Sequence, residues 1–176
     1  MPPKVISGGD NPYDIHDAKL SSSATAHESS SVTAHEISNN YAVIDTNVLG
    51  FAVLKWNSVP GNIIDLAFND VIIPLVNQEI LNEYKTVLLR PKFHLTELIV
   101  TDILDEMKAR AIDVSEEHLD VELPDPKDRV FYEVTMKARE SEDAHLITGN
   151  IKHFPTKPFI VTPRQMLDLI LESSNE

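Results

Sequence analysis

The chain has 176 residues, enough for one domain with a substantial core, and 42% of them are hydrophobic. It contains no cysteine, which excludes disulfides and thiolate metal sites, and no apolar run approaches the roughly 20 residues of a membrane-spanning helix. The formal net charge of −13 excludes a general nucleic-acid coat, because such proteins neutralise phosphates with Lys and Arg. A local basic rim or bound divalent cations could still attract phosphates. We expect a cytoplasmic protein with no membrane segment, since the start also lacks the apolar region of a secretory signal.

Residues 1–40 differ in composition from the rest of the chain. They include two serine triplets and a short repeat, Ser23–Glu28 and Ser31–Glu36, and they contain few large apolar residues. Such a segment buries too little apolar surface to offset the entropy lost on ordering. We predict a Ser-rich tail that is disordered or dependent on a partner, followed by one domain over residues 41–176. The two His-Glu pairs of the repeat could bind a metal, but a solvated tail is the favoured interpretation.

From Tyr41 onward, strand and helix patterns alternate. This order predicts an α/β fold with a central parallel sheet flanked by helices. The strands are predicted at 41–45, 71–74, 145–148 and 159–161. The helices are predicted at 48–55, 60–68, 77–89, 96–111, from about 126 to 138, and from 162 to the end, with a polar connection over 114–123.

Asp45 ends the first predicted strand and is followed by Thr46 and Asn47. In parallel sheets, ligands bind outside the carboxyl ends of the strands, so an acid at this point is placed for chemistry. The alternative is that Asp45 simply caps the following helix, a role that aspartate fills well. The Thr148-Gly149-Asn150 turn also follows a strand, and it should open onto the same edge of the sheet or be an ordinary turn.

Further acids follow in two blocks. Glu83 is predicted on the border of the buried helix stripe formed by Ile80, Tyr84 and Val87, where it can face a cleft or be an ordinary surface residue paired with a lysine. Asp125 and Asp128 flank a proline-initiated helix start, where acids suit the helix dipole. We interpret Asp125 mainly as a cap and Asp128 as a metal ligand that the dipole keeps ionised.

The four blocks in order resemble the PIN-domain family. They are Val43–Leu49, Glu79–Tyr84 with Arg90–Phe93, Asp125–Arg129 with Phe131–Val134, and Leu146–Asn150 with Lys152–Pro155. The similarity covers nearly all of residues 41–171, and the branch that it resembles most is that of the toxin components of bacterial toxin–antitoxin systems. It implies a PIN-like three-layer fold and a metal-dependent endoribonuclease, a hydrolase that cuts RNA phosphodiester bonds.

The resemblance also implies residue roles. Asp45, Glu83 and Asp128 match the catalytic acids that bind Mg²⁺ or Mn²⁺, whereas the fourth acidic position is Asn150 here. Thr46, Asn47 and Thr148 match positions that support the site. The lower charge leads us to expect one firmly held ion, which activates a water molecule, and a second ion recruited by RNA.

The basic residues nearest to the acids in sequence are Arg129 and Lys152, with Lys127 and His153 as further candidates. The resemblance implies an RNA substrate, a cognate antitoxin protein and a homodimer. A phosphatase of the haloacid dehalogenase type is disfavoured because Asn47 stands where a second acid is needed. A catalytically weakened PIN module that acts mainly through protein binding remains the alternative.

Overall fold

The computed structural model describes residues 39–115 and 118–176, and the predicted tail over residues 1–40 lies almost entirely outside them. Within these ranges, five strands form one sheet in the order β3-β2-β1-β4-β5. Every neighbouring pair is parallel, with Ala42 aligned to both Pro74 and His145. The strands are β1 (Asn40–Ile44), β2 (Ile72–Val76), β3 (Ile112–Asp113), β4 (His145–Ile147) and β5 (Ile160–Val161).

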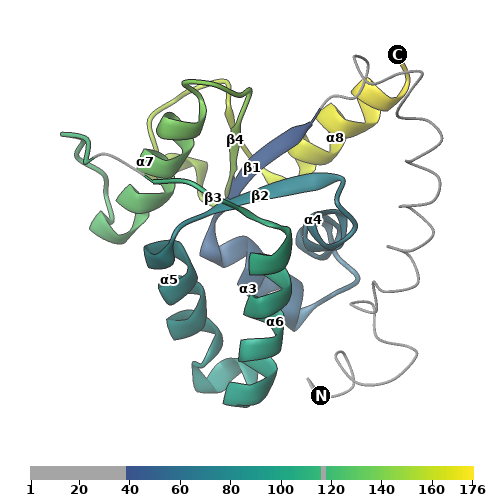
Figure 1. Ribbon diagram of the computed structural model, residues 1–176. Helices are drawn as coiled ribbons and strands as arrows, with labels where there is room; N and C mark the ends of the chain where they lie inside the picture. Colours follow the sequence, from purple (N-terminus) through teal and green to yellow (C-terminus); the bar gives the residue numbers. More distant parts are fainter. Residues whose placement is uncertain (1–38, 116–117) are drawn as a thin grey trace.

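Six α-helices of the described ranges cover the sheet. Helix α7 contacts β1, β2 and β4, and Figure 1 shows it on one side of the sheet with α4 and α6 on the other. The predicted α/β three-layer architecture is therefore confirmed. The helices are α3 (Thr46–Leu54), α4 (Val59–Phe68), α5 (Gln78–Leu88), α6 (Glu97–Arg110), α7 (Arg129–Ala138) and α8 (Pro163–Ser174), and three short 3₁₀ turns are η1 (Pro91–Phe93), η2 (Pro126–Asp128) and η3 (Ile151–His153).

Capping residues set where four of the helices begin. The side chain of each N-cap residue accepts a hydrogen bond from a backbone N–H of the first helical turn, which satisfies a donor without an intrahelical partner. The caps of α4, α5, α6 and α8 are Ser58, Asn77, Thr96 and Thr162. These polar residues stand just before apolar helical patterns, so the sequence places these four helix starts to within about a residue or two.

Strand β3 was not predicted, and β2 is longer than predicted. Strand β3 has only two residues, both exposed, and it lies at the edge of the sheet beside β2. Strand β2 continues beyond Pro74, the expected end, because Leu75 and Val76 pair with β3. No helix among the described residues is both long and apolar enough to span a membrane.

The parallel arrangement fixes where the site lies. Asp45 directly follows β1, and its backbone N–H donates to the carbonyl oxygen of Ile147, the last residue of β4, at 2.9 Å. Thr148 directly follows β4, so the two side chains leave neighbouring strands at the same edge. The buried Ala42, Val43 and Ile44 of β1 anchor this edge in the core.

Candidate active site

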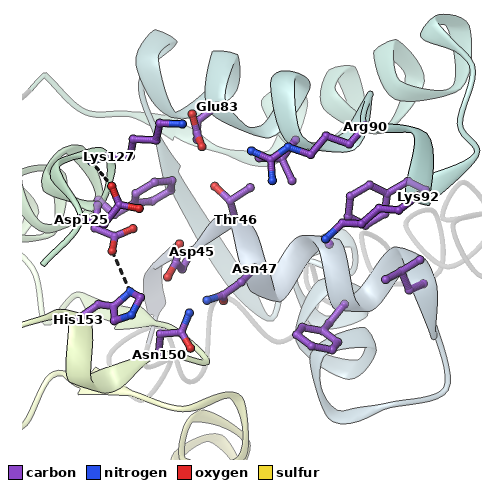
Figure 2. Close-up of a pocket in the computed structure, with 17 residues that line it drawn as sticks. Asp45, Thr46, Asn47, Glu83, Arg90, Lys92, Asp125, Lys127, Asn150 and His153 are labelled. Atoms are coloured by element: carbon purple, nitrogen blue, oxygen red, sulfur yellow. Dashed lines mark hydrogen bonds and ion pairs between the residues drawn. The ribbon is translucent and has the colours of Figure 1, made fainter.

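A pocket opens at the carboxyl edge of the sheet, with a cavity of about 350 Å³. This volume lies within the range of small-ligand sites in proteins. Figure 2 shows side chains from separate parts of the chain pointing toward it. The acidic residues that line it are Asp45, Glu83, Asp125 and Asp128, the basic ones are Arg90, Lys92, Lys127 and His153, and the others are Thr46, Asn47, Gly50, Phe51, Leu54, Val87, Phe93, Phe131 and Asn150.

Asp45 is the most deeply buried of these acids, with 5% of its surface exposed. It occupies the N-cap position of α3, but its side chain makes no capping hydrogen bond. Instead its Oδ2 accepts a hydrogen bond from Thr148 Oγ1 at 2.7 Å. Asp45 is therefore not a simple helix cap, and Thr148 at the neighbouring strand end holds one of its oxygens.

Burial raises the pKa of Asp45 from its ordinary 3.8 to about 6. The hydrogen bond from Thr148 opposes this rise by favouring the ionised form, and the negative charge of Asp128 adds to it. Ionisation of Asp45 therefore lowers the free energy of unfolding of the protein. A nearby cation would offset this loss of stability, because opposite charge stabilises the ionised form.

Asp128 and Asp125 come from the turn before α7. Asp125 caps η2, since its Oδ1 accepts from the backbone N–H of Lys127 at 3.0 Å. Asp128 makes no capping hydrogen bond, and its Oδ2 lies 3.2 Å from Nδ1 of His153. Burial raises the pKa of Asp128, the charges of Asp125 and Glu83 raise it further, and His153 opposes them.

Glu83 reaches the pocket from α5, and its neighbour in sequence sets its position. Tyr84 is fully buried and donates its hydroxyl hydrogen to the carbonyl oxygen of Ile44 at 2.5 Å, which fixes α5 against the end of β1. Burial, with the charge of Asp45 as a second cause, raises the pKa of Tyr84, so the hydroxyl keeps the proton that it donates. Glu83 is half-buried, and Lys85, one of the lysines that could have paired with it, pairs with Glu97 instead.

Polar residues brace the pocket from the two strand ends. Thr148 Oγ1, which donates to Asp45, accepts a hydrogen bond from the backbone N–H of Asn150 at 2.9 Å. Asn47 Oδ1 accepts from the backbone N–H of Gly149 at 3.3 Å and so joins the start of α3 to the β4 turn. The predicted supporting residues Thr46, Asn47, Thr148 and Asn150 therefore lie together at the ends of β1 and β4. Among the described residues, the buried hydroxyl of Thr46 has no hydrogen-bond partner.

The two residues predicted to bind substrate, Arg129 and Lys152, do not line this pocket themselves. The guanidinium of Arg129 donates from Nη2 to the carbonyl oxygen of Val121 at 3.0 Å. Lys152 lines an adjoining hollow, which shares Asn150 and His153 with the acidic pocket. Instead, Arg90 and Lys92 line the acidic pocket. Both stand in one of the four sequence blocks, but nothing in the local pattern shows that their turn meets the end of β1.

The acids lack strong compensation by cations. Within residues 39–115 and 118–176, the only ion pair of Asp45, Glu83 or Asp128 is the contact of Asp128 with His153. In the same ranges, no three His, Asp or Glu side chains stand close enough to hold one metal ion as they are oriented. The pocket thus contains several carboxylates, but these side chains do not surround one metal-ion position.

Comparison with known proteins identifies the family. A sequence model of the PIN domain matches residues 41–152, a stretch that contains Asp45, Glu83, Asp128 and Asn150. Comparisons with curated proteins and with solved structures gave no match. PIN domains are generally nucleases, which are hydrolases acting on nucleic acid, and many use divalent metal ions. Because the match spans well over half of the 176 residues and the sheet is that of a PIN-like fold, the chain belongs to the PIN-domain family.

Proposed function

We propose that this protein is a metal-dependent endoribonuclease in which Asp45, Glu83 and Asp128 hold Mg²⁺ or Mn²⁺. The observation that carries the proposal is their convergence. These three acids come from the end of β1, from α5 and from the turn before α7, and they line one pocket at the edge where parallel sheets bind ligands. Asp45 is buried there without a cationic partner, which is a poor arrangement for a structural acid.

The donor set suits a hard divalent cation. Mg²⁺ prefers oxygen ligands, keeps several waters, and is usually held by one or two carboxylates plus substrate phosphates. Such binding does not need three carboxylates in direct contact with the ion, which agrees with the open spacing of these side chains. The unpartnered Thr46 hydroxyl beside Asp45 offers a further oxygen. When bound, the ion would supply Lewis acidity that activates water and stabilises charge on the phosphate.

The surrounding residues orient these acids. Thr148 fixes one oxygen of Asp45 through its hydrogen bond. Asn47 joins the β4 turn to α3, and Asp125 shapes the turn that carries Asp128. Asn150 lines the pocket as a neutral amide, so the site carries less negative charge than four acids would give. This supports one firmly held ion, with a second recruited together with RNA.

We further propose that the protein is the toxin component of a toxin–antitoxin system. The support for this proposal is the resemblance of the four sequence blocks, which implies a cognate antitoxin and a homodimer. A cytoplasmic location is proposed because the chain has no cysteine. The experiment on biological role is expression of the full chain and of Asp128→Ala in a host, followed by sequencing of RNA ends. New RNA ends that appear only with the unsubstituted chain support the assignment. Growth arrest by both proteins contradicts it.

The nuclease itself is tested with purified full-length protein and RNA in Mn²⁺. Asp45→Asn should reduce cleavage more than about 100-fold, since even outer-shell partners of metal ligands contribute 10–100-fold. Asp168→Asn on α8 is the matched control, because Asp168 is an exposed aspartate away from the pocket, and it should cleave normally. Chelation of the metal should abolish cleavage. Equal cleavage by Asp45→Asn and the unsubstituted protein would refute the proposal.

The alternative is a PIN module that acts mainly through protein binding. The observation that favours it is Asn150 in place of a fourth acid at the pocket. It predicts no cleavage by any of these proteins in Mn²⁺ or Mg²⁺. The same assay therefore separates the two functions.

A further inference from the structure

One wall of the pocket is basic, although the chain as a whole is strongly acidic. Arg90 and Lys92 line the same cavity as Asp45, and Figure 2 shows them on the side away from Asp125 and His153. We propose that Arg90 and Lys92, called here the basic wall, bind backbone phosphates of the RNA strand next to the bond that is cut, while Phe51 stacks on a base. The inference rests on the nuclease function proposed above and assigns the residues that position its substrate.

The basic wall stands on a turn that the fold holds firmly. After α5 ends at Leu88, the chain turns through η1, and Phe93 buries its ring against α3. A Cβ atom at Gly50 would lie 3.1 Å from Cζ of Phe93, so the absence of a side chain on α3 allows this close approach. Since α3 begins directly after Asp45, the contact sets the basic wall at a fixed distance from the acids.

The charges of the basic wall are available to a ligand. Within the part of the chain that the structure describes, the guanidinium of Arg90 has no ion pair or hydrogen bond, and the ammonium of Lys92 lies 5.1 Å from the ring centroid of Phe93. Neither cation pairs with the acids of the same pocket. The planar guanidinium suits two-pronged contact with a phosphate, and Lys provides a point charge held over an aromatic ring.

An exposed aromatic side chain completes the surface. Phe51 on α3 is 63% exposed and lines the same pocket. Sites for single-stranded nucleic acid combine cations that follow the backbone with aromatic rings on which bases stack. Both features occur here beside a cluster of acids that suits a metal ion. The strand would thus be held by its phosphates and one unpaired base, with the acids left to the reacting phosphate.

The test measures binding rather than cleavage. Full-length Asp45→Asn protein, which should not cleave, is titrated in Mg²⁺ against a short fluorescent single-stranded RNA at several salt concentrations. Arg90→Gln and Lys92→Gln are added to this background, with Lys108→Gln on α6 as a matched exposed control. Each contact with a phosphate of a single strand contributes about 0.7 to the slope of log affinity against log salt.

The expected result is a loss of affinity with a slope about 0.7 shallower for each basic-wall variant. Lys108→Gln should leave both quantities unchanged, and Arg90→Lys should restore the slope because it restores the charge. A purely structural role would change affinity without changing the slope. Slopes for Arg90→Gln and Lys92→Gln equal to that of Lys108→Gln would overturn the inference, as would the absence of measurable binding by the parent protein.

The stacking role is tested separately with Phe51→Leu, which keeps an apolar side chain but removes the ring. Affinity for RNA should fall about tenfold, because stacking of one base on an aromatic ring contributes at this level. Affinity for an abasic strand should not change. Equal effects on both strands would overturn the role of Phe51. Failure of the nuclease assay with intact binding would refute the proposed chemistry, whereas cleavage that is independent of the basic wall would refute this inference.

Discussion

Replacing Asp45 with asparagine should stabilise the metal-free protein at neutral pH. The substitution removes the charge and keeps an oxygen that can accept the hydrogen bond from Thr148 Oγ1. Burial raises the pKa of Asp45 from 3.8 to about 6, and each pKa unit corresponds to about 1.4 kcal/mol. The ionised carboxylate therefore costs the folded state about 3 kcal/mol, and Asp45→Asn should recover up to this amount.

The effect should depend on pH in a defined direction. Because the pKa of Asp45 is higher in the folded state than in the unfolded chain, the folded protein holds the proton more tightly. The free energy of unfolding of the unsubstituted protein should then fall as the pH rises through the window between the two values, 3.8 and about 6. Below this window the carboxyl group is protonated in both states, so the advantage of Asp45→Asn should vanish.

The assay is urea denaturation of both proteins in chelator, at several pH values inside and on each side of the window. Asp168→Asn, an exposed substitution on α8, is the control and should show no such pattern. Adding Mg²⁺ should raise the stability of the unsubstituted protein and leave that of Asp45→Asn almost unchanged, since a ligand stabilises only the state that binds it. A stability difference that does not vary with pH, or an unsubstituted protein that is the more stable above the window, would refute the reasoning.

Three further substitutions test other parts of the structure. Thr148→Val removes the hydrogen bond that favours the ionised form of Asp45, so the pKa of Asp45 should rise further. NMR titration measures this pKa, and a lower value in the variant would contradict the expectation. Glu133 is buried and its Oε2 accepts from the backbone N–H of Leu119 at 2.5 Å, so Glu133→Ala should lower the free energy of unfolding by about 2 kcal/mol and accelerate hydrogen exchange at that amide. A Cβ at Gly61 would lie 1.7 Å from a carbonyl oxygen of the preceding loop, so Gly61→Ala should cost at least about 2 kcal/mol in urea denaturation. Gly149→Ala, whose Cβ would meet nothing closer than 3.6 Å, is its control and should be tolerated.

The spacing of apolar residues predicts most of the strands and the helices, because the apolar residues are the ones that the fold buries. The apolar residues before Asp45 are fully buried in β1, and the caps before α5 and α6 mark where these helices begin. Strand β3 has no such pattern of buried apolar residues. Its residues Ile112 and Asp113 are both exposed, and only pairing with β2 makes them a strand.

Asp45 could be predicted from the sheet alone, whereas the assignment of Glu83 and Asp128 depends on the resemblance to the PIN-domain family. A parallel sheet brings the ends of neighbouring strands together, so Asp45 and Thr148 are adjacent whatever the details of packing. No comparable rule predicts which basic residues lie beside the pocket. Arg129 directly follows Asp128 in sequence, but its side chain turns back to the carbonyl oxygen of Val121. Arg90 reaches the pocket because the ring of Phe93 packs on Gly50, a tertiary contact that no local pattern encodes.

The separation of charge within the pocket is what makes the site suitable for a cation. A lysine or arginine paired directly with Asp45 would remove the cost of its burial, but it would also occupy the place of a metal ion. The chain instead gives Asp45 a neutral donor, Thr148, and keeps Arg90 on another part of the pocket wall. Among the residues that the structure describes, the buried carboxylate has no cationic partner, and a divalent cation bound there would offset the same burial cost that lowers the stability of the metal-free protein. A variant that gains stability by neutralising Asp45 should therefore lose metal binding in proportion, because both effects arise from one buried charge.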